Sequence, residues 1–288
     1  MTAMRPEELT VVADGFAFPD CPRWHDGRLH LSDSHDSLVL AVGADGSTTE
    51  IVSVDGRPGG LGWLPDGRLL VVSMRGRALL RLDGEGLTTV CDLSRFSPHP
   101  WNDLVVDADG RAYVGGFGHD VEAGDEPEGA PLVCVEPDGE AWVVVDRLLL
   151  PNGAVVVDDP DGRSLVVSET YGQRLSAYRM QADGSLAEPR VWADVRPNVP
   201  DGLAADAEGA VWVADPVRRG LMRVVEGIGA VRWIPLEDRA PYALTLGGDD
   251  GGTLFVCTST TSNPARTLRE RSGRVEALEV DVPAAGAA

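Results

Sequence analysis

Short apolar runs alternate with polar positions along almost the whole chain, and a two-residue period dominates. Runs such as Leu69-Leu70-Val71-Val72 and Val211-Trp212-Val213 are typical of buried β-strands. We find no segment with the 3.6-residue period of an amphipathic helix, and we therefore predict no helix. The pattern indicates an all-β protein.

The strand-like runs belong to an internal repeat. Each unit holds an apolar run, an Asp-Gly or related turn, a second apolar run and two further short strands. Asp-Gly between apolar runs favours a hairpin, because glycine adopts a positive φ without a Cβ clash. The turn recurs, at intervals of 40 to 52 residues, at Asp26-Gly27, Asp66-Gly67, Asp109-Gly110, Asp161-Gly162, Glu208-Gly209 and Asp250-Gly251. Six units of four strands predict a six-bladed β-propeller.

We expect a single propeller domain over residues 1–288, with its core at about residues 9–280. Blades pack only on their neighbours, so the ring must close. Residues 9–12 precede the first unit, and we predict that they pair beside residues 274–280 to close it. Residues 120–129 are expected to form an exposed loop, and residues 283–288 a disordered tail.

The charge balance excludes several partners. The chain has 46 acidic and 25 basic residues, a net charge of −21, and every basic residue is arginine. Nucleic acid and anionic membranes require a basic face, so we expect neither as a partner. A Schiff-base lysine mechanism is excluded, and no apolar run is long enough to span a bilayer. A small-molecule substrate is the expected partner.

The four cysteines are far apart and form no CxxC pair. We interpret them as free thiols in a reducing compartment and expect a cytoplasmic protein. The arginine-only basic set, with abundant Ala, Gly and Val, fits a bacterial protein from a GC-rich genome. No heptad or long apolar edge points to a stable oligomer, so we expect a monomer or weak homodimer.

Polar residues interrupt the repeat just ahead of the Asp-Gly turns, where the inner strands of a propeller meet its channel. The residues that we align there are Asp20, Gly60, Asn102, Asn152, Asp201 and Ala243, the last beside Tyr242. Carboxylate and amide oxygens suit a hard divalent cation such as Ca²⁺, Mg²⁺ or Mn²⁺, whereas Zn²⁺ usually prefers His or Cys. Alternatively, each Asp or Asn only begins a turn.

Four segments resemble the gluconolactonase/regucalcin family, also called the senescence marker protein and luciferin-regenerating enzyme family. They are FPDCPRW at 18–24, Asn102-Asp103 ahead of VDADGR at 106–111, LPNG at 150–153 and VPDGL at 199–203. The resemblance covers roughly residues 10–280. It implies a six-bladed propeller with one axial divalent metal ion held by Asp20, Asn152 and Asp201. Ca²⁺ is the favoured ion, with Zn²⁺, Mn²⁺ or Mg²⁺ as alternatives.

The resemblance also implies an activity, the hydrolysis of a lactone or other cyclic ester by metal-activated water. Family members use the position of Asp201 as a general base. The position of Asn102 is expected to orient the substrate or the water.

Two departures from the family pattern bear on the substrate. The usual Glu-Gly-Pro is Asp20-Cys21-Pro22 here, which shortens a ligand and adds a thiol. The usual Arg-Pro before Asn-Asp is Pro100-Trp101, which removes a cation; His99 is a weakly basic replacement. With Trp101 in its wall, the pocket is expected to be more apolar than that of a sugar lactonase and to favour a more hydrophobic lactone.

Three further residues are candidates for the pocket, namely His35, Glu169 and Tyr242. Glu169 is expected either to line the pocket or to join a hydrogen-bond network there. Cys21 is an alternative nucleophile, but a catalytic cysteine needs a base and a lowered pKa, and the neighbouring Asp20 would raise it.

Two other classes of function stay open. One is a propeller with an altered or absent metal site that catalyses a cyclisation, dehydration or isomerisation. The other is a non-catalytic propeller that binds a ligand. A mere scaffold has no need of Asp20, Asn152 and Asp201 at one register, which argues against the last class.

Overall fold

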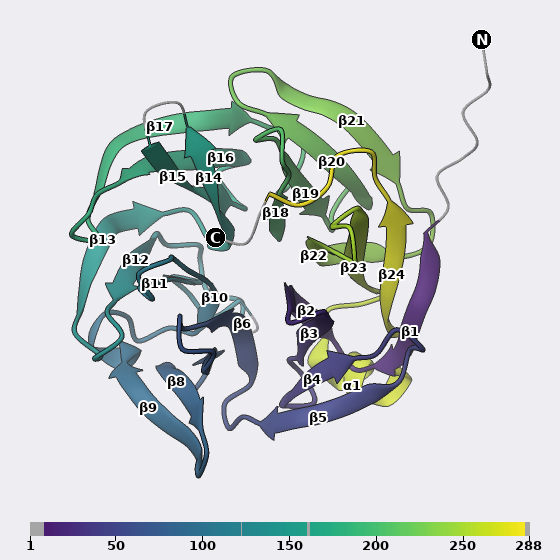
Figure 1. Cartoon of the computed structure of the whole chain (residues 1–288), viewed down its shortest axis with the longest axis horizontal. Helices are drawn as coiled ribbons and strands as arrows, with labels where there is room; N and C mark the ends of the chain where they lie inside the picture. Colours follow the sequence, from purple (N-terminus) through teal and green to yellow (C-terminus); the bar gives the residue numbers. More distant parts are fainter. Residues whose placement is uncertain (1–8, 122, 160–161, 286–288) are drawn as a thin grey trace.

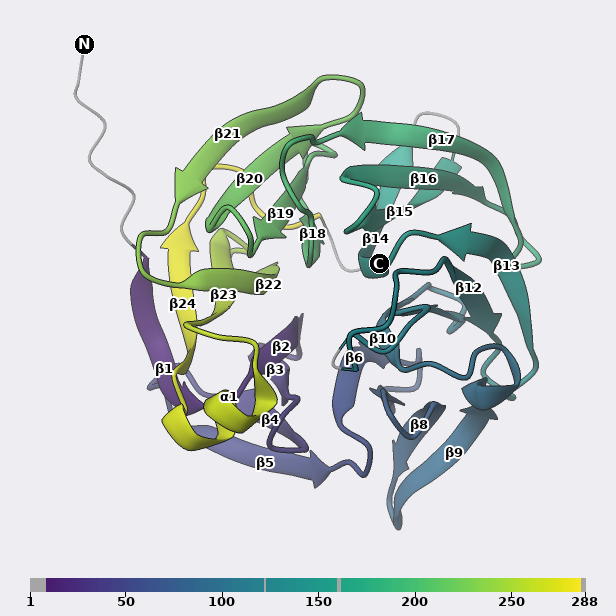
Figure 2. The same cartoon turned by 180° about the vertical axis from the view of Figure 1, so that it is seen from behind.

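Six four-stranded antiparallel sheets stand around a central axis in the computed structural model (Figures 1 and 2). The structure describes residues 9–121, 123–159 and 162–285. The predicted all-β, six-bladed propeller is confirmed. In each blade the strands follow one another in chain order from the axis outwards, except where the N-terminal strand joins the last blade.

The first three blades cover the first half of the chain. Blade 1 comprises β2 (Pro19–His25), β3 (Arg28–Asp33), β4 (Leu38–Val42) and β5 (Thr48–Ser53). Blade 2 comprises β6 (Pro58–Trp63), β7 (Leu69–Ser73), β8 (Ala78–Asp83) and β9 (Gly86–Asp92), and is followed by the short 3-10 helix η1 (Leu93–Arg95). Blade 3 comprises β10 (Trp101–Val106), β11 (Ala112–Gly116), β12 (Ala130–Val135) and β13 (Ala141–Leu148).

The other three blades complete the ring. Blade 4 comprises β14 (Pro151–Asp159), β15 (Gly162–Glu169), β16 (Arg174–Met180) and β17 (Leu186–Asp194). Blade 5 comprises β18 (Leu203–Ala205), β19 (Val211–Asp215), β20 (Gly220–Val225) and β21 (Gly229–Pro235). Blade 6 comprises β22 (Ala240–Gly247), β23 (Thr253–Ser259), β24 (Gly273–Glu279) and β1 (Thr10–Phe16).

The ring closes as predicted. β1 pairs antiparallel with β24, with Thr10 opposite Ala277 and Phe16 opposite Gly273. The first and last strands of the described chain therefore share one blade, where the purple and yellow strands lie side by side in Figure 1. The predicted turns lie between the first and second strands of the blades, although residue 161 falls outside the described residues.

The blades pack through apolar side chains and through close approach of their inner strands. One buried cluster joins Leu70 and Val72 of blade 2 to Leu104 and Val114 of blade 3. Gly60 makes this approach possible, because a Cβ there would lie 2.2 Å from the backbone nitrogen of Leu104.

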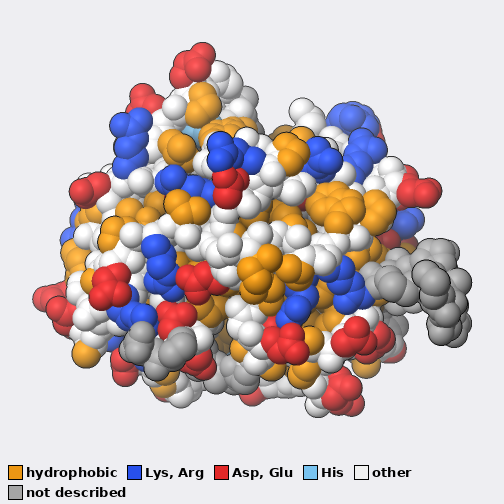
Figure 3. All heavy atoms as spheres, turned by 90° about the horizontal axis from the view of Figure 1, so that it is seen from above, with side chains coloured by type: hydrophobic (Ala, Val, Ile, Leu, Met, Phe, Trp, Pro, Cys, Tyr) orange, Lys and Arg blue, Asp and Glu red, His pale blue; other side chains and the backbone are white. Residues whose placement is uncertain are grey.

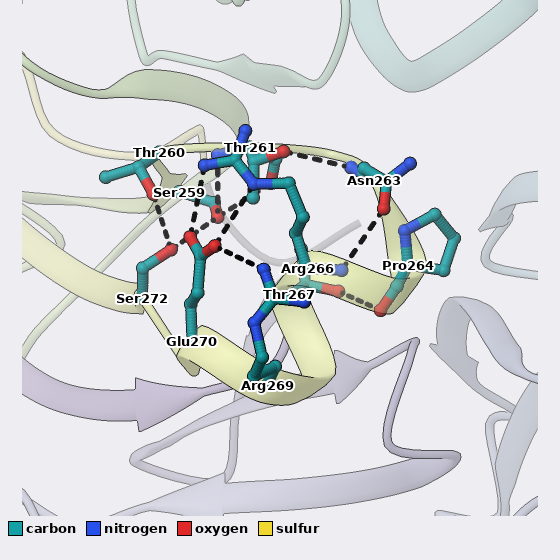
Figure 4. A network of polar contacts seen from close by, with 10 residues as sticks. All are labelled: Ser259, Thr260, Thr261, Asn263, Pro264, Arg266, Thr267, Arg269, Glu270 and Ser272. Carbon is teal, nitrogen blue, oxygen red and sulfur yellow. Dashed lines mark hydrogen bonds and ion pairs between the residues drawn. The ribbon is translucent and has the colours of Figure 1, made fainter.

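The prediction of no helix is wrong at one place, since α1 (Pro264–Glu270) lies in the connection between β23 and β24. The Asn263 side chain accepts from the backbone N–H of Arg266, and Pro264 occupies the first turn. These are capping signals, and seven residues are too few to show a helical period. Hydrogen bonds and ion pairs hold the helix in its loop (Figure 4).

The predicted disorder of the tail is also wrong in part. The backbone N–H of Ala284 donates to the carbonyl of Gly251, and that of Ala285 to the carbonyl of Ala205. Residues 286–288 lie outside the described part. The described residues of the 120–129 loop are largely exposed, as predicted.

The surface carries no extended single-sign area on the face shown in Figure 3, where acidic and basic side chains intermingle with apolar ones. Within the described ranges, no helix is long and apolar enough to cross a membrane.

Candidate active site

The candidate oxygen donors line one cavity of about 330 Å³. Asp20, Asn102, Asn152 and Asp201 come from four different blades, and Tyr242 joins them from a fifth. The other residues that line the cavity are Phe18, Ser34, His35, Arg57, Met74, Arg75, Pro100, Phe117, Asp120, Val121, Leu150, Thr170, Tyr171, Val199, Pro216, Val217 and Ser262. The repeat therefore brings its irregular positions to one place.

A β-bulge near the start of the inner strands presents these side chains. Pairing is interrupted between Asp20 and Arg23, and likewise at the equivalent places of blades 2, 3, 4 and 6. Bulges re-aim side chains beside functional sites. The strand pairing also corrects our alignment of the positions ahead of the Asp-Gly turns. The residues equivalent to Asp20 are Gly59 and Tyr242, one residue before the predicted Gly60 and Ala243.

Asp20 is half-buried, and its carboxylate accepts a hydrogen bond from the next residue of the chain. Its Oδ1 accepts the backbone N–H of Cys21 at 2.8 Å. Burial raises the pKa of Asp20 to about 7; the carboxylate of Asp103 raises it further, while the Cys21 N–H and the Arg23 guanidinium lower it. Cys21 takes a φ of 46°, a conformation that favours glycine, which is the residue of the family motif.

Asp201 is fixed through its backbone. Its N–H donates to the carbonyl of Ala214 at 2.9 Å, and its carbonyl accepts from the Ser168 hydroxyl at 2.7 Å. Burial raises the pKa of the Asp201 carboxyl well above its usual 3.8, and the carboxylates of Asp20 and Asp103 raise it further. The carboxylate of Asp20 therefore opposes the ionisation of Asp201 in the cavity.

Asn102 carries an unsatisfied donor. It is 4% exposed, and its Nδ2 has no hydrogen-bond partner among the described residues. An unpaired buried amide costs free energy, so it marks a place where a ligand or water oxygen would be bound.

Buried carboxylates at the ends of second strands hold the loops that carry the site. Asp33 accepts the backbone N–H groups of Ala17 and Phe18, ahead of Asp20. Asp215 likewise accepts the backbone N–H of Val199, which lies ahead of Asp201. Our sequence reasoning missed both, although their shared register in the repeat was a usable signal.

Glu169 belongs to this set of buried carboxylates. The structure corrects the expectation that Glu169 contacts the substrate and shows it in a hydrogen-bond network instead. It is fully buried and lies outside the cavity lining. Its Oε2 accepts the Leu149 N–H at 3.0 Å, and its Oε1 accepts from Arg174 at 2.7 Å and from Ser176. It supports the loop ahead of Asn152 instead of facing the substrate.

Trp101 and His99 are also absent from the described cavity lining. Trp101 is fully buried in the core between blades 2 and 3. It precedes Asn102 directly, and successive side chains of a strand point to opposite faces, so it turns away from the cavity.

His35 does line the cavity, and a residue of α1 holds its ring in place. The Thr267 hydroxyl donates to the carbonyl of Pro264 at 3.0 Å (Figure 4) and lies 2.7 Å from His35 Nδ1. The direction of the hydrogen bond between Thr267 and His35 depends on the imidazole tautomer, and in either direction it fixes the orientation of the ring. The ring also stacks on Phe18, with centroids 4.6 Å apart.

Tyr242 faces the same cavity from blade 6. Burial raises the pKa of its hydroxyl, although a hydrogen bond with Ser262 lowers it. Ser262 precedes α1, so the helix and its loop support two residues of the wall.

Two arginines in the cavity lining, Arg57 and Arg75, escaped our sequence reasoning. Both lie in loops of blade 2, where no motif marks them. The candidates His35 and His99 came from the corresponding loops of blades 1 and 3. The repeat therefore did indicate that these loops of blade 2 approach the cavity.

The donor set suits a hard cation. Within the described ranges, no group of three or more His, Cys, Asp or Glu side chains could hold a metal ion. The cavity instead combines the carboxylates of Asp20 and Asp201 with the amides of Asn102 and Asn152, while a third carboxylate of its lining, Asp120, pairs with Arg75. Such an all-oxygen set fits Ca²⁺ or Mg²⁺ better than a soft metal.

Comparison with known proteins agrees with this geometry. The family described as "SMP-30/Gluconolactonase/LRE-like region" matches residues 18–260. A 6-deoxy-6-sulfogluconolactonase of Pseudomonas putida is 27% identical over 269 residues, which cover 90% of this chain and 87% of that protein. A pentonolactonase of Haloferax volcanii is 25% identical over 260 residues, which cover 84% and 82%. The structure of a regucalcin from Agrobacterium tumefaciens superposes with a TM-score of 0.81 at 18% identity and covers 99% of this chain and 98% of that one.

Proposed function

The chain belongs to the SMP-30/Gluconolactonase/LRE-like family, and on this premise we propose that it hydrolyses a lactone or other cyclic ester in the cavity at Asp20 and Asp201. One observation carries the proposal. The carboxyl groups of Asp20 and Asp201, both with a raised pKa, line one cavity with the unpaired amide of Asn102. This arrangement destabilises the fold when nothing is bound. A cation bound to the carboxylates and an oxygen atom bound to the Asn102 amide would explain it.

We place a divalent cation, most simply Ca²⁺, at Asp20, Asn152 and Asp201. When bound, it would polarise the lactone carbonyl and lower the pKa of a water molecule. Asp20 and Asp201 supply the negative charge, and Asn152 supplies a neutral oxygen.

The side chains of the cavity have separate tasks in this reaction. The Asn102 amide donates a hydrogen bond to the lactone oxygen or to the water, which fixes the direction of attack. The Asp201 carboxylate accepts the proton of the attacking water. Phe18 and Tyr242 stand in the wall and exclude bulk water.

Apolar residues such as Phe117, Leu150 and Val199 make much of the wall. They support a lactone with a hydrocarbon face, as the sequence suggested. The cavity is not purely apolar, however, since Arg57 and Arg75 also line it.

We also propose a cellular compartment and an oligomeric state. The four cysteines are free and buried, which supports a reducing, cytoplasmic environment. We expect a monomer or weak homodimer, which light scattering at two concentrations measures.

The test is a pH-indicator assay of lactone hydrolysis with Ca²⁺, Mn²⁺ and Zn²⁺ supplied in turn. We expect turnover with one of them, a loss of at least about 100-fold in kcat with Asp201→Asn, and a comparable loss with Asn102→Ala. An exposed matched variant, Asp138→Asn, should keep the wild-type rate. Turnover that survives Asp201→Asn would overturn the role of Asp201, whereas no turnover with any of the three ions would overturn the proposed hydrolysis and favour the non-hydrolytic class or a binding propeller.

A further inference from the structure

Arg57 and Arg75 approach the cavity from adjoining segments of blade 2. Arg57 directly precedes β6, and Arg75 closely follows β7. The backbone N–H of Arg75 donates to the carbonyl of Gly56 at 2.7 Å, so the two loops are joined beside the cavity. The two guanidinium groups therefore belong to one side of the site.

Blade 2 differs from its neighbours at the axial register. Gly59 stands where Asp20, Asn102, Asn152 and Asp201 stand in other blades, and a Cβ on it would lie 2.5 Å from the carbonyl oxygen of Asn102. Blade 2 thus supplies no oxygen donor from its inner strand and supplies two cations from its loops. Among the described residues that line the cavity, Arg57 and Arg75 are the only arginines, so a ligand bound at the donors meets their positive charge from this side.

The charge of the chain makes this placement informative. There are 46 acidic residues against 25 arginines, and the cavity already holds Asp20 and Asp201. Arg75 Nη1 lies 3.4 Å from Asp120 Oδ2, so Asp120 offsets one of the two cationic charges. A guanidinium carries five N–H donors in a fork, more than one carboxylate accepts, so this ion pair is compatible with a second oxyanion.

We propose that the substrate carries an anionic substituent, a carboxylate, sulfonate or phosphate, and that Arg57 and Arg75 bind it. The lactone ring then lies between this substituent and the donors Asp20, Asn102 and Asp201. The inference rests on the proposed lactone hydrolysis and names its class of substrate. It revises the expectation of a wholly hydrophobic lactone, because the apolar wall contacts the ring while the arginines select the substituent.

The experiment compares two lactones that differ only in charge, γ-butyrolactone and γ-carboxy-γ-butyrolactone. Three proteins are compared, namely the wild type, the double variant Arg57→Met/Arg75→Met, and Arg77→Met. Arg77 lies two residues beyond Arg75 and is outside the described cavity lining, which makes it a matched control.

The wild type should prefer the carboxylated lactone by at least about 10-fold in kcat/KM, which corresponds to about 1.4 kcal/mol. The double variant should lose this preference, so that its kcat/KM values for the two lactones lie within about threefold of each other. Arg77→Met should keep both rates. Raising the ionic strength from about 0.05 M to about 0.5 M should reduce the preference, since the arginines are partly exposed.

A wild type without preference, or a preference that survives the double substitution, overturns the inference. If neither lactone is opened, calorimetry with the ring-opened dicarboxylate decides. Binding that is lost in the double variant then supports the anion subsite while the proposed hydrolysis fails, and no binding to the wild type overturns the subsite itself.

Discussion

Arg23 of blade 1 reaches Asp103 of blade 3, with Nη2 2.6 Å from Oδ1. The same nitrogen lies 2.7 Å from the carbonyl oxygen of Leu104. Blade 2 stands between them, and a Cβ on its Gly60 would lie 2.7 Å from Asp103 Oδ1. The side chains are 22% and 7% exposed, so the ion pair is largely buried and joins blades that are not adjacent. Because Asp103 follows Asn102, the pair also fixes the strand that carries the candidate substrate-binding amide.

Loss of this arginine is expected to destabilise the ring. Arg23→Met leaves Asp103 buried without its cation, which typically costs about 3–5 kcal/mol. Urea unfolding at neutral pH measures the change, and Arg28→Met, at an exposed position of the same hairpin, is the control. A loss below about 1 kcal/mol, equal to that of the control, would show that the bridge is unimportant.

Glu169 should make stability depend on pH. Burial favours its neutral form, yet hydrogen bonds from Arg174, Ser176 and the Leu149 N–H leave its pKa below the usual 4.5. A lowered folded-state pKa stabilises the fold above about pH 4.5, and this contribution is lost as the pH falls through the folded-state value.

Glu169→Gln should therefore cost about 1–3 kcal/mol at pH 7, and the gap from the wild type should narrow as the pH is lowered toward the folded-state pKa. Unfolding curves across this range measure it, with the exposed Glu50→Gln as the control. A gap that is constant over the whole range would contradict this role.

Cys21 is expected to be a packing residue. Burial raises the pKa of its thiol well above 9.0, and the carboxylates of Asp103 and Asp20 raise it further, so little thiolate exists at neutral pH. Cys21→Ala should keep kcat within about threefold, and the native thiol should react slowly with Ellman's reagent. Cys257→Ala, at another buried thiol, is the matched control. A loss of about 100-fold in Cys21→Ala alone, together with rapid labelling, would instead identify a nucleophile.

The repeat made the fold and the convergence of Asp20, Asn102, Asn152 and Asp201 predictable, because equivalent positions of a propeller meet at its axis. The one-residue error at Gly60 and Ala243 arose from β-bulges, which sequence spacing does not reveal. The misplacement of Trp101 was avoidable, since strand alternation turns it away from Asn102.

Other features depend on long-range contacts. Arg57 and Arg75 lie on loops without periodicity, and only the closed ring brings them to the cavity. Glu169 was assigned to the pocket because its strand ends there, but its partners Arg174 and Leu149 draw it into the blade. α1 is too short for its periodicity to stand out, although Asn263 and Pro264 are typical of a helix start.

The central claim is that Asp20, Asn152 and Asp201 hold a divalent cation. Inductively coupled plasma mass spectrometry, on protein purified without chelator and desalted from excess Ca²⁺, tests it most directly. We predict about one ion per chain, lost in Asp201→Ala and in the milder Asp201→Asn and retained in the exposed control Asp138→Ala. Protein that retains no ion after exposure to excess Ca²⁺, Mn²⁺ and Zn²⁺ would contradict the cation site and the hydrolytic mechanism built on it.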